Sequence, residues 1–109
     1  MEKSWWTTYF FKRNILIKIL MKIQIELFGA SRDFSDHNFL EFDIENNSTI
    51  KDIRNELINY LDKKFSGNES YKKIVNSSAF CSENNNIVSD NYKIKNNEKI
   101  AIIPPIGGG

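Results

Sequence analysis

The apolar run Ile100–Ile103, which two prolines end abruptly, constrains the fold more than any other stretch. No strand can continue through Pro104 and Pro105, because each proline lacks a backbone N–H and has its φ fixed at about −65°. The near-continuous apolar character of the run predicts a strand in the middle of a sheet, buried on both faces. Ile106 and the glycines Gly107–Gly109 follow. They are typical of a narrow, adaptable tail that can thread into another protein, the alternative being a frayed terminus.

The size and charge of the chain exclude several classes of function. With 109 residues it is expected to form one domain. Residues 1–20 have a net charge of +3 and the remainder −2. The body is therefore mildly acidic, which argues against a nucleic-acid-binding protein. The only cysteine, Cys81, and the only histidine, His37, cannot make a structural zinc site or a disulfide, so we expect no metal and no catalytic side chain. Cys81 is interpreted as a small core residue. A single cysteine is also typical of a protein in a reducing compartment, and we expect the cytosol.

Residues 1–20 differ from the rest and are interpreted as an N-terminal extension outside the fold. Charged and polar residues interrupt their apolar stretches, so no span approaches the ~20 apolar residues of a membrane helix. No small-residue cleavage site follows them, which disfavours a signal peptide, although a transit peptide remains an alternative. The predicted domain covers residues 21–109 and opens at Met21.

The next two apolar patterns have the period of two that marks half-buried strands. One runs over residues 21–27 and the other over residues 38–44, with a polar turn predicted over residues 29–37 between them. This spacing predicts an antiparallel hairpin. Phe28 interrupts the polar face of the first strand and is either an exposed apolar contact or a cover for the sheet edge.

A helix is predicted to follow the hairpin. Thr49 and Asp52 resemble a capping box, and Gly67 can end the helix. One apolar stripe at helical spacing faces the core: Ile50, Ile53, Leu57, Ile58, Leu61 and Phe65. Residues 66–78 predict no more than a short helical turn, and residues 78–82 and 86–88 predict short strands around an asparagine loop.

The order of elements predicts an α+β protein. If the last strand is central, it pairs beside the first, and the main helix packs across one face of a mixed sheet. This is the β-grasp arrangement of ubiquitin-like folds.

Over residues 21–109 the chain resembles the small, sulfur-carrying subunit of molybdopterin synthase, a ubiquitin-like family. The resemblance rests on the segment Leu27–Asp33, on Thr49 at the helix start and above all on Glu98–Gly109 with its Pro-Pro-Ile-Gly-Gly-Gly ending. Two departures are Asn96–Asn97, where family members usually have Asp-Gly, and Cys81, where an asparagine is common.

The resemblance implies a cycle of activation and transfer. An E1-like activating enzyme would use ATP and Mg²⁺ to adenylate Gly109, and a sulfur donor would convert it to a thiocarboxylate. The tail, Pro104–Gly109, would enter the large catalytic subunit of the synthase, in a heterotetramer, and donate sulfur to the dithiolene of molybdopterin. Phe28 would face the partners. The chain itself would be a non-catalytic subunit without a permanently bound cofactor.

Three other functions remain open. The alternatives are a sulfur carrier for thiamine synthesis or tRNA thiolation, a ubiquitin-like modifier conjugated to lysines, and a binding module whose tail is irrelevant. Carriers for thiamine synthesis or tRNA thiolation generally lack the double proline. The double proline therefore favours a carrier for molybdopterin synthesis.

Overall fold

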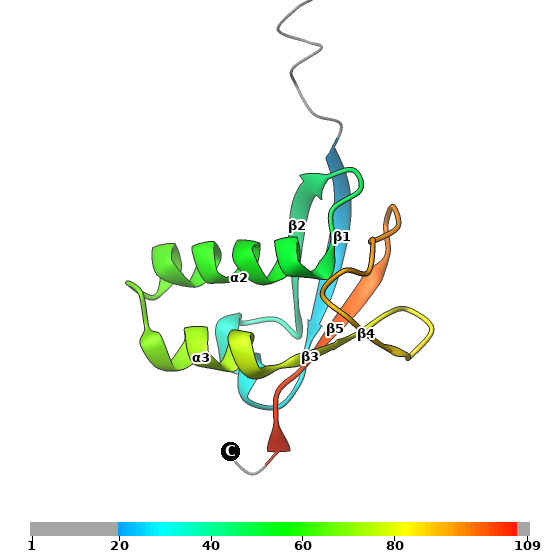
Figure 1. Cartoon of the computed structure of the whole chain (residues 1–109). Coiled ribbons are helices and arrows are strands. Elements are labelled where there is room, and N and C mark those ends of the chain that lie inside the picture. The colour runs from blue at the N-terminus through cyan, green and yellow to red at the C-terminus, as the bar shows by residue number, and fades with distance from the viewer. Residues whose placement is uncertain (1–19, 107–109) are drawn as a thin grey trace, which may run out of the picture.

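The computed structural model describes residues 20–106 of the chain. A five-stranded sheet has the order β2-β1-β5-β3-β4, and two α-helices cover one of its faces (Figure 1). The elements are β1 (Leu20–Leu27), the 3₁₀ helix η1 (Gly29–Phe34), β2 (Phe39–Glu45), α2 (Ile50–Lys64), α3 (Glu69–Ser77), β3 (Ala79–Cys81), β4 (Ile87–Val88) and β5 (Lys99–Ile103). The predicted α+β fold is confirmed.

The last strand lies in the middle of the sheet, as predicted. β1 and β2 form the antiparallel hairpin, with Leu20 opposite Glu45 and Glu26 opposite Phe39. β5 runs parallel to β1, with Ile25 beside Ile100, and antiparallel to β3 on its other side. Because β1 and β5 run in the same direction, β1 begins at one end of the sheet and β5 ends at the other.

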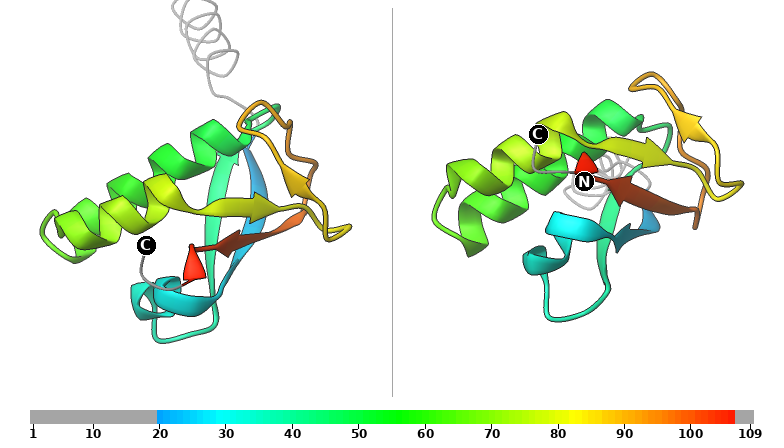
Figure 2. Two further views of the ribbon diagram at one scale, coloured as in Figure 1. Left: turned by 60° about the horizontal axis from the view of Figure 1, so that its bottom comes forward. Right: turned by 90° about the horizontal axis from the view of Figure 1, so that it is seen from below.

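The core lies between the sheet and α2. Figure 2 shows α2 lying across the sheet. The alternating residues of β1 and the helical stripe of α2 are buried there, as their periodicities predict. The fully buried side chains include Ile23, Ile25, Leu27, Ile50, Ile53, Leu57, Leu61, Phe80, Ile100 and Ile102. The predicted capping box is also present, since the backbone N–H of Thr49 donates to Asp52 Oδ2 at 2.9 Å.

Asparagines form three of the tight turns. Asn47, Asn85 and Asn97 have φ values of 71°, 63° and 61°. Asparagine tolerates this left-handed region better than most residues other than glycine. The departure at Asn96–Asn97 from the usual Asp-Gly turn is therefore accommodated without a glycine.

Two segments are more helical than the sequence predicted. The predicted polar turn contains η1, and the predicted short helical turn is the nine-residue helix α3. The side chain of Asn68 caps α3 by accepting the Tyr71 N–H at 3.1 Å. The Tyr71 ring packs against Phe34 and Phe65, with centroids 5.3 and 5.0 Å away. These contacts between distant segments stabilise a helix whose own sequence is mostly polar.

The predictions of full burial for β5 and of a core position for Cys81 were wrong. Ile100 and Ile102 are fully buried, but Ala101 and Ile103 are only half-buried on the opposite face. Both α-helices pack on the same face of the sheet, which leaves the other face open (Figures 1 and 2). Phe80 occupies the core position of β3, so its neighbour Cys81 lies on the open face and is half-buried.

Candidate functional site

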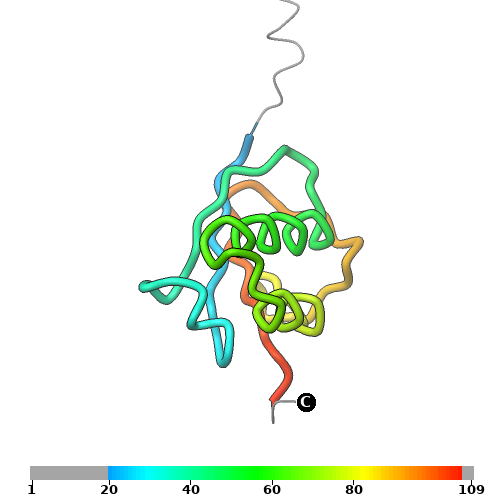
Figure 3. The backbone as a smooth tube through the Cα atoms, turned by 90° about the vertical axis from the view of Figure 1, so that its left-hand side faces the viewer, coloured from blue at the N-terminus to red at the C-terminus, as the bar shows by residue number. Residues whose placement is uncertain are grey.

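The predicted tail starts where β5 ends. Pro104 is buried against the domain, whereas Pro105 is exposed and Ile106 is 97% exposed. We call Pro104 and Pro105 the tail root. Figure 3 shows β5 continuing past the helices to this end of the molecule. The chain therefore leaves the fold directly from the central strand, which anchors the root between β1 and β3. Gly107, Gly108 and Gly109 lie outside the described residues.

The 3₁₀ helix η1 packs against the tail root. Gly29 has a φ of +57°, and a Cβ placed on it would meet Cγ and Cδ of Pro104 at 3.8 Å. This is ordinary contact distance, so the left-handed backbone rather than lack of space favours glycine here. The start of η1 is thus shaped to lie directly beside Pro104.

Phe28 projects beside the tail root and is 44% exposed. Its backbone is extended, with φ −128° and ψ 155°, so it continues the alternation of β1 and lies on the open face. Leu27 pairs with Ile102, which places Phe28 next to Ile103 at the same end of the sheet. Phe28 is therefore an exposed apolar residue near the tail; its role as a partner contact stays a prediction.

Ser31 holds Phe28 in place, a role that the sequence did not reveal. The Ser31 hydroxyl is fully buried, donates to the Phe28 carbonyl at 2.7 Å and accepts the Phe28 N–H at 3.0 Å. The Ser31 N–H also donates to the Phe28 carbonyl at 3.1 Å. A serine three residues after an extended residue was the signal available, because serine side chains commonly bond nearby backbone.

We predict that Ser31→Ala lowers the free energy of unfolding by about 1–2 kcal/mol, because it removes the two hydrogen bonds that the buried Ser31 hydroxyl makes with the backbone of Phe28. Urea denaturation measures this loss, and the Phe28 amide should exchange with solvent faster. Ser35→Ala is the control, because the Ser35 hydroxyl accepts only an exposed bond from the His37 N–H. A Ser31 variant as stable as the Ser35 variant would contradict the role given to Ser31.

An apolar patch extends from Phe28 across the open face. Ala79, Ala101 and Ile103 are half-buried there, and Ile87 is 74% exposed. The register aligns Cys81 between Ala101 and Ile87. Phe28, Ile103 and Ala79 lie where β5 ends, beside the tail root, and Ala101, Cys81 and Ile87 extend the patch toward the edge strand β4.

The displaced pKa values belong to groups away from the tail root. A hydrogen bond to Tyr60 raises the pKa of Lys64, and a hydrogen bond to Asp62 raises the pKa of Lys72. Desolvation, followed by a hydrogen bond to Glu98, raises the pKa of Tyr92. The Lys64–Tyr60 bond lies within α2, the Lys72–Asp62 pair joins α3 to α2, and the Tyr92–Glu98 bond secures the segment before β5.

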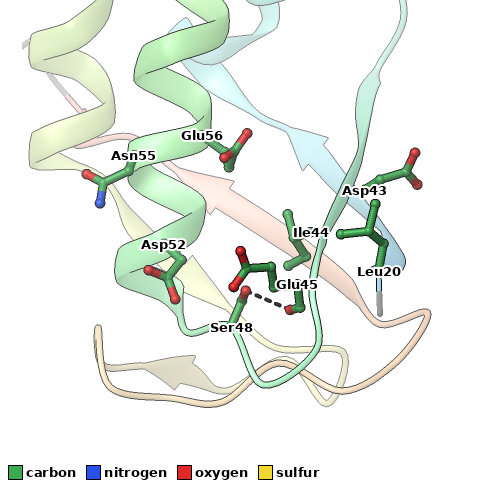
Figure 4. A pocket seen from close by; sticks show the side chains of 8 residues that line it. All are labelled: Leu20, Asp43, Ile44, Glu45, Ser48, Asp52, Asn55 and Glu56. Carbon is green, nitrogen blue, oxygen red and sulfur yellow. Dashed lines mark hydrogen bonds between the residues drawn. The ribbon is translucent and has the colours of Figure 1, made fainter. Parts of the chain in front are cut away.

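A pocket lies at the end of the molecule opposite the tail root, where β1 begins. It has a volume of about 400 Å³ and is bordered by acidic residues from β2 and α2: Asp43, Glu45, Asp52 and Glu56. Figure 4 shows that the carboxylates of Asp43 and Asp52 point away from each other. Within residues 20–106, no group of three or more His, Cys, Asp or Glu side chains could hold a metal ion. We assign this pocket no ligand.

The helices of the described region are too short or too polar to span a bilayer: none between residues 20 and 106 qualifies.

The mixed sheet, the helix across it and the tail leaving its central strand define the class of protein: a ubiquitin-like protein with the β-grasp fold. Three solved structures share this fold. The small archaeal modifier protein SAMP1 from Haloferax volcanii has a TM-score of 0.59 at 14% identity, covering 81% of this chain and 99% of its own. A protein described as molybdopterin converting factor subunit 1, from Pyrococcus furiosus, has 0.60 at 17%, covering 79% and 99%. Caldiarchaeum subterraneum ubiquitin has 0.53 at 16%, covering 84% and 100%.

The family is more specific than the fold. The chain belongs to the ThiS family, whose model matches residues 25–109. That range begins within β1 and includes the tail. No curated protein sequence matches the chain.

Proposed function

We propose that this ThiS-family protein is the sulfur carrier subunit of a molybdopterin synthase. The observation that supports this most is the tail: a central strand, a buried Pro104, an exposed Pro105 and Ile106, and then the glycines that end the sequence at Gly109. The likeness to the protein described as molybdopterin converting factor subunit 1 adds support at the level of the fold. The double proline favours this function over thiamine or tRNA thiolation.

The proposed chemistry takes place at Gly109. A carboxylate is a poor electrophile, whereas a mixed anhydride with AMP has a good leaving group. An E1-like enzyme that uses ATP and Mg²⁺ would form this adenylate, and a sulfur donor would then replace AMP to give the thiocarboxylate. The tail would then enter the large subunit of the synthase, in a heterotetramer in the cytosol, and donate its sulfur to the dithiolene of molybdopterin. None of these steps requires a catalytic side chain on the carrier.

The fold lowers the cost of delivering the tail. Ordering a flexible residue in a partner costs about 1–2 kcal/mol. Two consecutive prolines restrict the backbone before binding, so less freedom is lost at the tail root. The burial of Pro104 beside Gly29 fixes the place where the tail leaves the domain.

Co-expression with an activating enzyme and a sulfur donor tests the proposal. We expect the intact mass of the carrier to rise by the difference between one sulfur and one oxygen atom. A known carrier that is converted under the same conditions is the control. If that carrier is converted and this chain is not, the sulfur-carrier function is wrong.

A ubiquitin-like modifier is the second candidate, because SAMP1 structures from both Haloferax volcanii and Methanosarcina acetivorans share the fold. An adenylate or thiocarboxylate at Gly109 could also be attacked by a lysine amine. Isopeptide-linked products that disappear when Gly109 is deleted would favour the modifier, whereas thiocarboxylate without such products favours the carrier.

A further inference from the structure

A small groove opens beside the tail root, between α3 and η1. It has a volume of about 320 Å³, and Ala30, Lys73, Ile74, Ser77, Pro104 and Pro105 line it. This volume is at the lower end for sites that hold a small molecule. The walls contributed by Ala30, Ile74 and the two prolines are apolar. The groove is thus of a size and character to receive one or two side chains of another protein.

Lys73 contributes the positive charge of the groove lining. Its ammonium has no hydrogen bond or ion pair with any other residue between 20 and 106, whereas its neighbour Lys72 pairs with Asp62 at 2.9 Å and Glu69 at 3.5 Å. Lys73 is exposed. A carboxylate that arrives from a partner can therefore pair with Lys73 without displacing an existing interaction. Such pairing across an interface favours a partner of opposite charge.

We propose that this groove is a docking site for the activating enzyme when it takes up the tail, and that it receives from that enzyme a segment with an apolar side chain next to a carboxylate. The apolar side chain packs on Ile74 and the prolines, and the carboxylate pairs with Lys73. This inference rests on the proposed function, because it assumes that a partner encloses the tail. Pro104 and Pro105 form both the tail root and a wall of the groove, so a partner that encloses the tail comes next to this groove.

The length of the tail limits the distance between the tail root and the reaction centre of a partner docked at the groove. Four residues follow Pro105, and four extended residues span at most about 14 Å. A partner anchored at the groove therefore has its reaction centre within about that distance of the root. Lys73 and Ile74 contribute binding energy, whereas the length of the tail sets how far its reactive end extends from the root.

Steady-state kinetics of adenylation test the groove. We expect Lys73→Glu to raise the KM of the activating enzyme for the carrier by about tenfold. The kcat should stay unchanged, since the lost contact is made equally in the ground and transition states. Lys63→Glu is the matched control, because Lys63 is an exposed lysine on α2 outside the groove and the change of charge is the same. Equal KM values for the two variants would overturn the inference. If the wild-type chain is not adenylated at all, the proposed function fails instead.

Binding of a small probe tests the proposed docking site independently of adenylation. N-acetyl-leucyl-glutamate amide added to the full chain should shift the NMR amide signals of Ala30, Lys73 and Ser77, and more strongly than N-acetyl-leucyl-glutamine amide. Lys73→Glu should abolish that preference, and Lys63→Glu should keep it. Equal shifts with both probes, or shifts spread over the molecule, would overturn the proposed docking site.

Discussion

Deletion of Gly109 is expected to reduce both thiocarboxylate formation and molybdopterin synthesis by at least about 100-fold while the fold remains intact. The shortened chain still ends in a glycine carboxylate, so the effect comes from position. One residue less withdraws the reactive carbon by about 3.5 Å. A displacement of only about 1 Å can already cost 100-fold in an active site. The anchored root cannot compensate, because Pro104 is buried and β5 is held between two strands.

Two controls separate the loss of reach from other effects. Gly109→Ala keeps the length of the tail and adds one methyl group, so it should retain more activity than the deletion. Thermal unfolding of both variants should match that of the wild-type chain, since Ile106 is already 97% exposed and the glycines follow it. Molybdopterin is measured in a reaction reconstituted with the large subunit. A fully active deletion variant would contradict the carrier function and support a binding module with an irrelevant tail.

The elements that could be predicted from the sequence have local patterns strong enough to determine them. The alternation in β1, the capping box at Thr49 and the apolar run of β5 each lie within a few residues. The apolar run of β5 predicts a strand inside the sheet, and this position brings β5 beside β1. This is why the main helix and the order of the central strands were predicted correctly.

What was missed depends on contacts between distant residues. α3 has few apolar residues, and Tyr71 gains its partners from η1 and from the end of α2. The burial of β5 was overestimated because the sequence does not show that α2 and α3 both pack on one face of the sheet and leave the other face uncovered. In the candidate site, the tail could be predicted because it is contiguous. The groove could not, because Ala30, Lys73 and Pro104 come together only in the fold.

Glu98 is another residue whose role required the structure. It is only 3% exposed, and its carboxylate accepts three hydrogen bonds. The donors are the Tyr92 hydroxyl at 2.8 Å, the Lys95 N–H at 2.8 Å and the Glu83 N–H at 3.3 Å. They come from the connection before β5 and the loop after β3. Glu98 therefore binds together the segments that lead into the central strand, at the end opposite the tail root.

Glu98→Ala is expected to lower the free energy of unfolding by about 3 kcal/mol, because it removes the partner of three donors in a buried place. Glu98→Gln should lose less, about 1–2 kcal/mol. Its amide oxygen can still accept the Lys95 N–H, and the Tyr92 hydroxyl can turn to accept from the amide nitrogen, but the Glu83 N–H then faces a donor.

Urea denaturation followed by circular dichroism measures the stability of both Glu98 variants. Glu56→Ala, an exposed carboxylate on α2, is the control and should change stability by less than about 0.5 kcal/mol. If Glu98→Ala is as stable as this control, the three hydrogen bonds do not contribute to folding; if Glu98→Gln is as unstable as Glu98→Ala, charge rather than hydrogen-bond number dominates.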